Sequence, residues 1–213
     1  MAKHTIAILG AGNVGGALGR LWASAGHDVT FGLPDPQSEK SRAAVSKIGG
    51  KVRAAKNKDA TATAQIVALC VPWPAAQDAI RECENLSGKI VIDCVNPLTP
   101  DLQGLALGTT TSASEQVASW APGAKVVKAF NTIGADNFGH AQFGAQRADG
   151  FYCGDDSGAK NTVRELIDSA GLDPVDVGPL RNARWLEAMA ILWIDLALNQ
   201  KQGPGHAFKL LRR

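Results

Sequence analysis

The sequence lacks the residue patterns that mark several classes of protein. Its 213 residues contain only four cysteines, and these form neither a CxxC pair nor another spacing typical of a disulfide framework or a zinc site. Cys70 and Cys94 lie in apolar runs, so we expect them to be small core residues. Scattered cysteines of this kind are typical of a reducing compartment. The sequence therefore predicts a cytoplasmic protein without a metal site.

Charge of one sign and long apolar runs are also scarce. The 22 Lys and Arg residues nearly balance the 20 Asp and Glu residues, and the net charge of +2 argues against binding to nucleic acid or to a membrane surface. The longest apolar run, residues 186–198, is interrupted by Glu187 and Asp195 and is too short to span a bilayer. No signal peptide is expected, because the N-terminus leads directly into a strand pattern. Small molecules are therefore the expected partners.

A glycine-rich segment near the N-terminus carries the clearest positive signal. An apolar run over residues 5–9 predicts a strand, and a helical pattern runs from Asn13 to about Ala25. At their junction lies the dinucleotide-binding fingerprint, in its required context of strand, turn and helix. Its first glycine permits the tight turn, its second lets the backbone approach a pyrophosphate, and its third lets the helix pack on the strand. The fingerprint consists of Gly10, Ala11, Gly12, Asn13, Val14 and Gly15.

Strand and helix patterns alternate along the rest of the chain. This alternation predicts an α/β fold, a Rossmann-type doubly wound parallel sheet with strand order 3-2-1-4-5-6 and further strands at the far edge. We expect a single dinucleotide-binding domain over residues 1–213, with a Rossmann core to about residue 178 and a C-terminal helical segment and tail over about 182–213. The expected strands are 5–9, 28–32, 51–54, 66–71, 89–94, 125–130, 151–154 and 174–177, and the expected helices are 13–25, 38–48, 58–63, 75–83, 114–120, 159–170 and 183–199.

The last expected helix, residues 183–199, is apolar on nearly all sides. Such a helix is normally buried, either in its own chain or against a partner. Trp185 and Trp193 are eight residues apart and do not share a face, so one could lie in the core and the other at an interface. We therefore expect a homodimer, because pairing by a twofold axis is the commonest assembly.

Ligands of an open parallel sheet bind at the carboxyl ends of its strands. The end of the second strand chooses the cofactor, since NAD needs an acid there, whereas NADP needs a small residue and a cation. This chain has Gly32-Leu33-Pro34-Asp35 at that point. Asp35 could hold a ribose or only cap the next helix, and Lys40 and Arg42 are cations nearby. The choice between the two cofactors stays open here.

Residues for acid–base catalysis are missing from the other strand ends. None of the four histidines lies there, the single tyrosine, Tyr152, has no lysine four residues on, and Lys128 is expected at the sheet face. Asp93 could be a base or a structural hydrogen-bonding group. Direct hydride transfer between two bound ring cofactors needs no such group, because the protein mainly stacks and orients the rings. We therefore expect no catalytic side chain, and the wall of the second ring is expected to be Pro72, Trp73, Asn96, Pro97, Thr132 and Ile133.

Five strings carry a resemblance to a known family. They are residues 8–15, Val71-Pro72-Trp73, residues 127–133 with Lys-Ala-Phe-Asn-Thr-Ile, Cys153-Gly154-Asp155-Asp156, and residues 177–184 with Gly-Pro-Leu-Arg-Asn-Ala-Arg. The chain resembles, over nearly its whole length, the NADPH-dependent deazaflavin oxidoreductases, which pass hydride between NADP(H) and coenzyme F420. The cytoplasmic reductase domain of a class of membrane metal reductases looks similar and uses a flavin.

The resemblance implies roles for residues at the strand ends. Residues 11–14 would hold the pyrophosphate, Leu33 and Pro34 would lie beside the adenosine ribose, and Asn131 with its two successors would face the deazaflavin or flavin. Together with the strand ends, the expected cofactor contacts are Gly10, Ala11, Gly12, Asn13, Val14, Gly15, Leu33, Pro34, Val71, Pro72, Trp73, Val95, Asn96 and Ala135. The expected pocket for the second ring is Asn96, Pro97, Asn131, Thr132 and Ile133.

One departure and two alternatives remain. The family commonly places Arg or Ser-Arg where this chain has Leu33-Pro34, so both NADP(H) and NAD(H) stay open as cofactors. A small hydroxyacid or imine-type dehydrogenase is one alternative, but it would use a helix lysine, and residues 182–199 contain none. The other alternative is a non-catalytic dinucleotide sensor, since a fold alone does not fix a function.

Overall fold

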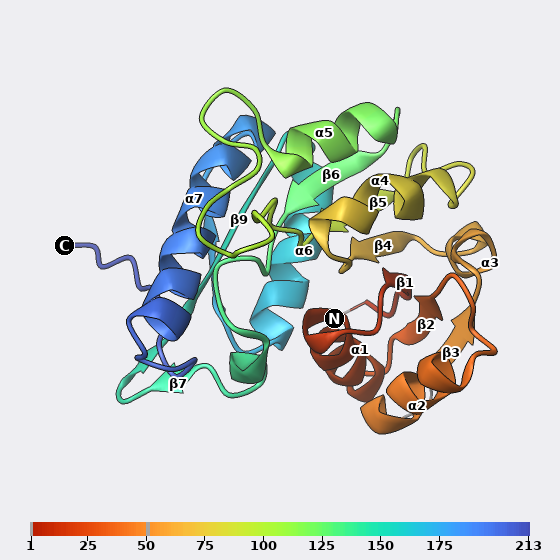
Figure 1. The fold of residues 1–213 in the computed structure, drawn as a ribbon, viewed down its shortest axis with the longest axis horizontal. Coiled ribbons are helices and arrows are strands. Elements are labelled where there is room, and N and C mark those ends of the chain that lie inside the picture. The colour runs from red at the N-terminus through yellow and green to blue at the C-terminus, as the bar shows by residue number, and fades with distance from the viewer. Residues whose placement is uncertain (1, 50–51) are drawn as a thin grey trace.

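An eight-stranded sheet forms the centre of the molecule (Figure 1). The structure is a computed structural model that describes residues 2–49 and 52–213. The spatial order is β10-β9-β6-β5-β4-β1-β2-β3. Its strands are β1 (Thr5–Leu9), β2 (Asp28–Gly32), β3 (Val52–Ala55), β4 (Ile66–Leu69), β5 (Ile90–Asp93), β6 (Lys125–Lys128), β9 (Asp149–Gly154) and β10 (Asp173–Asp176).

The first six strands confirm the predicted order, and all of their pairings are parallel. The prediction of a parallel sheet is wrong at the far edge, where β9 pairs antiparallel with β6 and β10 runs parallel to β9. The chain returns from β6 through a loop with a short hairpin, β7 (Gln142–Phe143) and β8 (Gln146–Arg147), and not through a helix. A parallel pair needs a crossover, usually helical, whereas this loop allows the strand to reverse.

Helices cover both faces of the sheet. Side chains of α1, α2 and α6 belong to one apolar cluster, and those of α3, α4 and α5 belong to another. Successive residues of β4 point to opposite clusters, as expected of a strand buried on both faces. The helices are α1 (Asn13–Ser24), α2 (Glu39–Ile48), α3 (Asn57–Ala62), α4 (Trp73–Arg81), α5 (Ala113–Trp120), α6 (Ser157–Ser169) and α7 (Ala183–Ile194), with short turns η1 (Ala135–Asn137), η2 (Leu180–Asn182) and η3 (Asp195–Asn199).

The C-terminal helix has its predicted span, as α7 and the π-helical turn η3 that continues it. Its own chain buries only part of its apolar surface, because Trp185, Leu192 and Leu198 are 61%, 52% and 58% exposed. A buried face therefore packs on β9, while an apolar face remains open. The predicted third strand began at Lys51, which lies outside the described residues.

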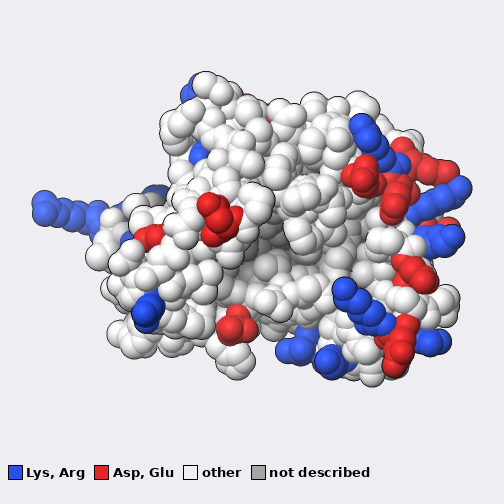
Figure 2. All heavy atoms as spheres, viewed as in Figure 1, with Lys and Arg blue, Asp and Glu red and all other residues white. Residues whose placement is uncertain are grey.

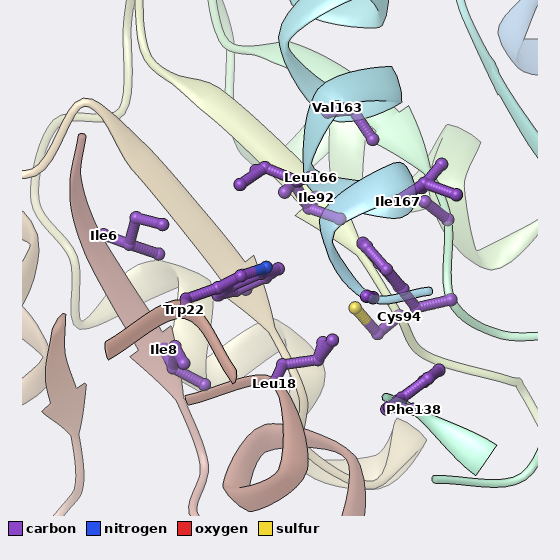
Figure 3. Close-up of a cluster of buried hydrophobic side chains, with 14 of the residues drawn as sticks. Ile6, Ile8, Leu18, Trp22, Ile92, Cys94, Phe138, Val163, Leu166 and Ile167 are labelled. Atoms are coloured by element: carbon purple, nitrogen blue, oxygen red, sulfur yellow. The ribbon is translucent and has the colours of Figure 1, made fainter. Parts of the chain in front are cut away.

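The larger apolar cluster contains Trp22 and Phe138 among aliphatic side chains (Figure 3). Trp22 is fully buried and meets Phe130 edge-on, and Phe130 meets Phe138 in the same way. Phe130 has a φ of +63°, which is rare for a bulky residue. This packing holds the turn at the end of β6, from which the next residues enter the site.

Candidate functional site

The fingerprint loop is shaped by close contacts that only glycine permits. Gly10 has a φ of +99° and donates its N–H to the carbonyl of Gly32 at 3.1 Å. A Cβ on Gly15 would lie 2.2 Å from the Gly10 carbonyl oxygen, and one on Gly10 would lie 2.7 Å from the Cys70 carbonyl oxygen. The first and third glycines of the fingerprint therefore hold α1 against the ends of β1 and β4.

The second glycine, Gly12, has a different role. A Cβ at Gly12 would meet no atom within 4 Å. Gly12 is the N-cap of α1, makes no side-chain cap and is followed by a first turn without an acid. The first N–H groups of α1 are therefore open toward this space. A pyrophosphate fits there, because it would use both the free N–H groups and the space that a side chain would fill.

A cavity of about 270 Å³, which we call the ring cavity, lies beside the start of α1. It brings together six of the predicted residues from three strand ends. The C-terminal segment closes its other side with residues that sequence reasoning did not assign to the site. Its lining is Asn13, Val14, Cys94, Asn96, Phe130, Asn131, Ile133, Gly134, Ala135, Asp136, Trp193, Ile194 and Pro204.

Amide hydrogen bonds fix the floor of the ring cavity. Asn131 donates its side-chain N–H groups to Asn96 Oδ1 and to the Leu186 carbonyl, each at 3.0 Å. Asn96 donates in return to the Asn131 carbonyl at 3.1 Å. The ends of β5 and β6 are thereby joined to each other and to α7. Both amide orientations are set, because the hydrogens of Asn131 face two acceptors.

A buried charge network lies below this floor. Lys128 donates to Asp93 Oδ2 at 3.0 Å and pairs with Glu187 Oε1 at 2.9 Å, and all three side chains are 0% exposed. Lys128 also donates to the Val95 carbonyl, and the Ser114 hydroxyl donates to Asp93 at 2.6 Å. The expectation that Lys128 lies at a sheet face is therefore incomplete. Asp93, left open as a base, has a structural hydrogen-bonding role.

The pKa shifts in this network follow from burial and charge. Burial lowers the pKa of Lys128, but the charges of Asp93 and Glu187 outweigh this and the net shift is upward. Burial raises the pKa of Glu187, and the nearby Lys128 only partly opposes the rise. Lys128 is therefore held as a cation. The network binds α7 and the start of α5 to the sheet.

The ring cavity contains few groups that titrate. A hydrogen bond with Cys70, together with burial, raises the pKa of Cys94 well above its ordinary value, so Cys94 is a neutral thiol. The exposed carboxylate of Asp136 lies at the rim and also borders the next groove. The lining contains no histidine, lysine or tyrosine.

Two further hollows continue from the fingerprint. One, of about 370 Å³, runs between α1 and α2 past Arg20 and Lys47. The other, of about 460 Å³, lies at the end of β2, and we call it the adenosine cavity. It contains the predicted Leu33 and Pro34, and its lining is Ala11, Gly12, Leu33, Pro34, Asp35, Ser38, Lys40, Ser41 and Ala44. Figure 2 shows a hollow in the middle of this face that is mainly uncharged, while charged side chains gather on the side of α2, α3 and α4.

Some predicted residues do not line these hollows. Trp73 stacks on Trp120 with ring centroids 5.4 Å apart, and Val95 and Thr132 are buried in the protein. Their assignments to the site stay predictions, as do those of Val71, Pro72 and Pro97. Conversely, Trp193, Ile194 and Pro204 were not assigned to the site, although Trp193 stood out in the apolar pattern of the last helix.

Trp193 reaches the cavity because its neighbours leave room. A Cβ on Gly134 would lie 2.6 Å from the Trp193 ring, so only glycine allows this approach. The ring also stacks on His206 and donates its N–H to the His206 carbonyl at 2.9 Å. Asn137 donates to the Pro204 carbonyl at 3.1 Å and ties the C-terminal segment to η1.

Two negative findings apply to residues 2–49 and 52–213. Within them, no helix combines the length and the apolar character needed to cross a membrane. No group of three or more His, Cys, Asp or Glu side chains there could hold a metal ion.

The mostly parallel sheet, the uncapped helix behind a glycine loop and the ring cavity define a dinucleotide-binding protein of the Rossmann class. Residues 5–97 match the family model described as coenzyme F420-dependent NADP oxidoreductase. A candidate F420-dependent NADP reductase from Arthrobacter sp. FB24 is 33% identical, with a TM-score of 0.88 over 98% of this chain and 100% of that chain. The chain therefore belongs to the family of coenzyme F420-dependent NADP oxidoreductases.

Two other relatives support this membership. The F420-dependent NADP reductase of Methanothermobacter thermautotrophicus is 29% identical over 94% of this chain and 92% of that protein. The metalloreductase STEAP3 of Rattus norvegicus is 27% identical over 87% of this chain, which spans only 36% of that longer protein. Family membership makes the chain an NADP(H)-dependent oxidoreductase and does not favour the dehydrogenase or the sensor.

Proposed function

We propose that the protein transfers hydride between NADP(H) and the deazaflavin coenzyme F420 in the ring cavity. The dinucleotide extends from the adenosine cavity past Gly12 to the side of Val14. Its nicotinamide meets the second ring between the ends of β5 and β6 and the C-terminal segment. Binding and orientation by the protein are sufficient for this reaction, and the bound cofactors supply the hydride chemistry.

The lining of the ring cavity is the observation that carries this proposal. Its amides are locked by hydrogen bonds, Cys94 is a neutral thiol, and no histidine, lysine or tyrosine is present. A reaction that needs a proton acceptor from the protein has no suitable group there other than the carboxylate at the rim. Direct transfer between two rings needs only apolar walls and a fixed floor.

Transfer of a labelled hydride tests the proposal. NADPH carrying deuterium at the transferred position should reduce coenzyme F420, and the deuterium should appear in the product without loss to water. Flavin mononucleotide as the alternative acceptor tests whether the protein is also a flavin reductase. Binding of NADPH without oxidation by either acceptor would contradict the proposal and favour a sensor.

The open apolar face of the C-terminal helix supports a homodimer as a second part of the proposal. Trp185, Leu192 and Leu198 expose more than half of their surfaces there. We propose that a second copy of the chain covers them. Light scattering should give twice the mass of the chain, and Leu192→Glu should give a monomer. A wild-type monomer at micromolar concentration would contradict the dimer.

The working environment is proposed from the cysteines. Cys70, Cys83, Cys94 and Cys153 are all free thiols. Burial raises the pKa of Cys153 to about 12 and that of Cys83 to about 11, so both are unreactive. These properties suit a reducing compartment such as the cytoplasm. Fluorescence of a tagged chain in its host would test the location.

A further inference from the structure

The end of β2 disfavours the usual acid of an NAD site. A Cβ on Gly32 would lie 2.6 Å from Leu9 Cδ2 and 2.7 Å from Asn57 Oδ1. Both neighbours are buried. A side chain at this position would therefore require the buried side chains of Leu9 and Asn57 to move. The packing of β1, β2 and α3 thus disfavours the usual acid here.

Asp35, the nearest acid in the adenosine cavity, is already used by its own turn. Its Oδ1 accepts the N–H of Gln37 at 3.0 Å and that of Ser38 at 3.2 Å. These bonds shape the loop between β2 and α2. The carboxylate is thus held toward the backbone of its own loop.

Lys40 is the cation that the adenosine cavity contains. Among the described residues, no ion pair or side-chain hydrogen bond engages its ammonium group. Ser41 lies beside it in the lining, and its hydroxyl oxygen is 2.9 Å from that of Ser38. The Ser38 hydroxyl has one hydrogen and donates it to the Asp35 carbonyl at 3.0 Å, so Ser41 is the donor between the two hydroxyls. The Ser41 hydroxyl can rotate from Ser38 to donate to a ligand in the cavity. Arg42, two residues after Lys40 on the same helix, is exposed like Lys40 but does not line the cavity.

We propose that Lys40, assisted by the Ser41 hydroxyl, recognises the 2′-phosphate of NADP(H) and so determines the cofactor preference of this chain. This inference rests on the proposed function, because it assumes that a dinucleotide occupies the fingerprint. The 2′-phosphate is the group that distinguishes NADP from NAD, and a dianion there requires a cation and hydrogen-bond donors. Leu33 and Pro34 at the end of β2 have uncharged side chains, so neither can supply that cation.

Binding titrations with NADP⁺ and NAD⁺ test the proposal. The wild type should bind NADP⁺ more tightly, and Lys40→Gln should raise the Kd for NADP⁺ about five- to tenfold at low salt, where tenfold is about 1.4 kcal/mol. The Kd for NAD⁺ should change less than twofold. Ser41→Ala should give a smaller change in the same direction. Arg42→Gln is the matched control and should change neither Kd.

Fragments of the cofactor locate the effect. Adenosine 2′,5′-bisphosphate should lose affinity in Lys40→Gln, whereas adenosine 5′-monophosphate should not. Equal losses for NADP⁺ and NAD⁺ would overturn the proposal, because Lys40 would then serve a group that both share. A loss of NADP⁺ preference in Arg42→Gln would overturn it as well.

These measurements separate the inference from the proposed function. Binding is measured without a hydride acceptor, so a chain that reduces no deazaflavin can still show the shift in Lys40→Gln. The inference then stands while the proposed reaction fails. If the wild type oxidises NADPH with the acceptor but Lys40→Gln keeps the preference for NADP⁺ over NAD⁺, the proposed reaction stands and the inference about Lys40 fails. A wild type that binds neither dinucleotide overturns both.

Discussion

Two halves of the site are stabilised in different ways. In the nucleotide half, formed by β1, α1 and the end of β2, the shape depends on backbone atoms that approach glycines. In the ring half, formed by the ends of β5 and β6 and by the C-terminal segment, it depends on hydrogen-bonded amides above a buried charge network. The nucleotide half can therefore be disrupted by adding one carbon atom, and the ring half by removing one charge.

The two halves also differ in how far apart in the sequence their contacting residues lie. Gly10 and Gly15 meet each other within one turn of the chain, whereas Lys128 and Glu187 come from β6 and α7. Mutations in the two halves should consequently affect different measured quantities. Four variants test this separation, in order of expected effect.

Loss of the buried cation should have the largest effect. Lys128→Met leaves the carboxylates of Asp93 and Glu187 without their partner and should lower the free energy of unfolding by about 3–5 kcal/mol. Urea unfolding measures it. Glu187→Gln is the matched control and should cost clearly less, because the pKa of Glu187 is already raised and the amide keeps the size of the side chain. Equal losses would mean that charge is not the source of the stability.

Addition of one carbon atom should break the nucleotide half. Gly15→Ala places a Cβ 2.2 Å from the Gly10 carbonyl oxygen and should cost about 2–3 kcal/mol of stability. It should also weaken NADP⁺ and NAD⁺ equally. Gly12→Ala is the control, since its Cβ meets no protein atom within 4 Å. It should keep the stability and lose only dinucleotide affinity, and unchanged binding in calorimetry would refute the pyrophosphate position.

Removal of an aromatic wall should affect the second ring alone. Trp193→Ala should raise the KM for coenzyme F420 about tenfold, because the ring cavity loses stacking surface worth about 1.5 kcal/mol. The Kd for NADP⁺ should stay within twofold. Trp185→Ala, on the same helix but 61% exposed and outside the lining, is the control for KM. A larger effect on the Kd for NADP⁺ than on the KM for coenzyme F420 would contradict the separation of the site into two halves.

Addition of a cation at the adenosine cavity should give the smallest effect. Pro34 is exposed in its lining, and Pro34→Arg supplies a guanidinium there. The Kd for NADP⁺ should fall about fivefold, or about 1 kcal/mol for an exposed charge pair. Pro34→Gln controls for the loss of the ring. An equal gain for NAD⁺ would place the new charge at the pyrophosphate.

The sequence predicts the nucleotide half better than the ring half, because the first depends on contacts near in sequence and the second on contacts between distant residues. The order of the first six strands and the strand–turn–helix context of the fingerprint follow from patterns over a few residues, and both are confirmed. The reversed direction of β9 depends on how the loop after β6 folds back, and a loop has no periodic pattern of apolar residues from which this could be predicted. The pairing of Lys128 with Glu187 joins residues far apart in sequence, and each looked like an exception in an apolar run.

The role of Trp193 shows the same limit. Its apolar pattern predicted burial, but whether it faces its own chain or a partner depends on the absence of a side chain at Gly134. Asp136 gave no sequence signal, because a single acid in a polar segment has many roles. Its place at the rim depends on the path of the chain after β6, which no local pattern marks.

The order of these elements along the chain has a consequence for synthesis. The contacts that shape the fingerprint lie within the first 70 residues, which leave the ribosome early and belong to strands that pair with one another. The ring cavity lacks a wall until residues 193–204 have been made. A newly made chain therefore completes the proposed nucleotide site before it completes the proposed site of the hydride acceptor.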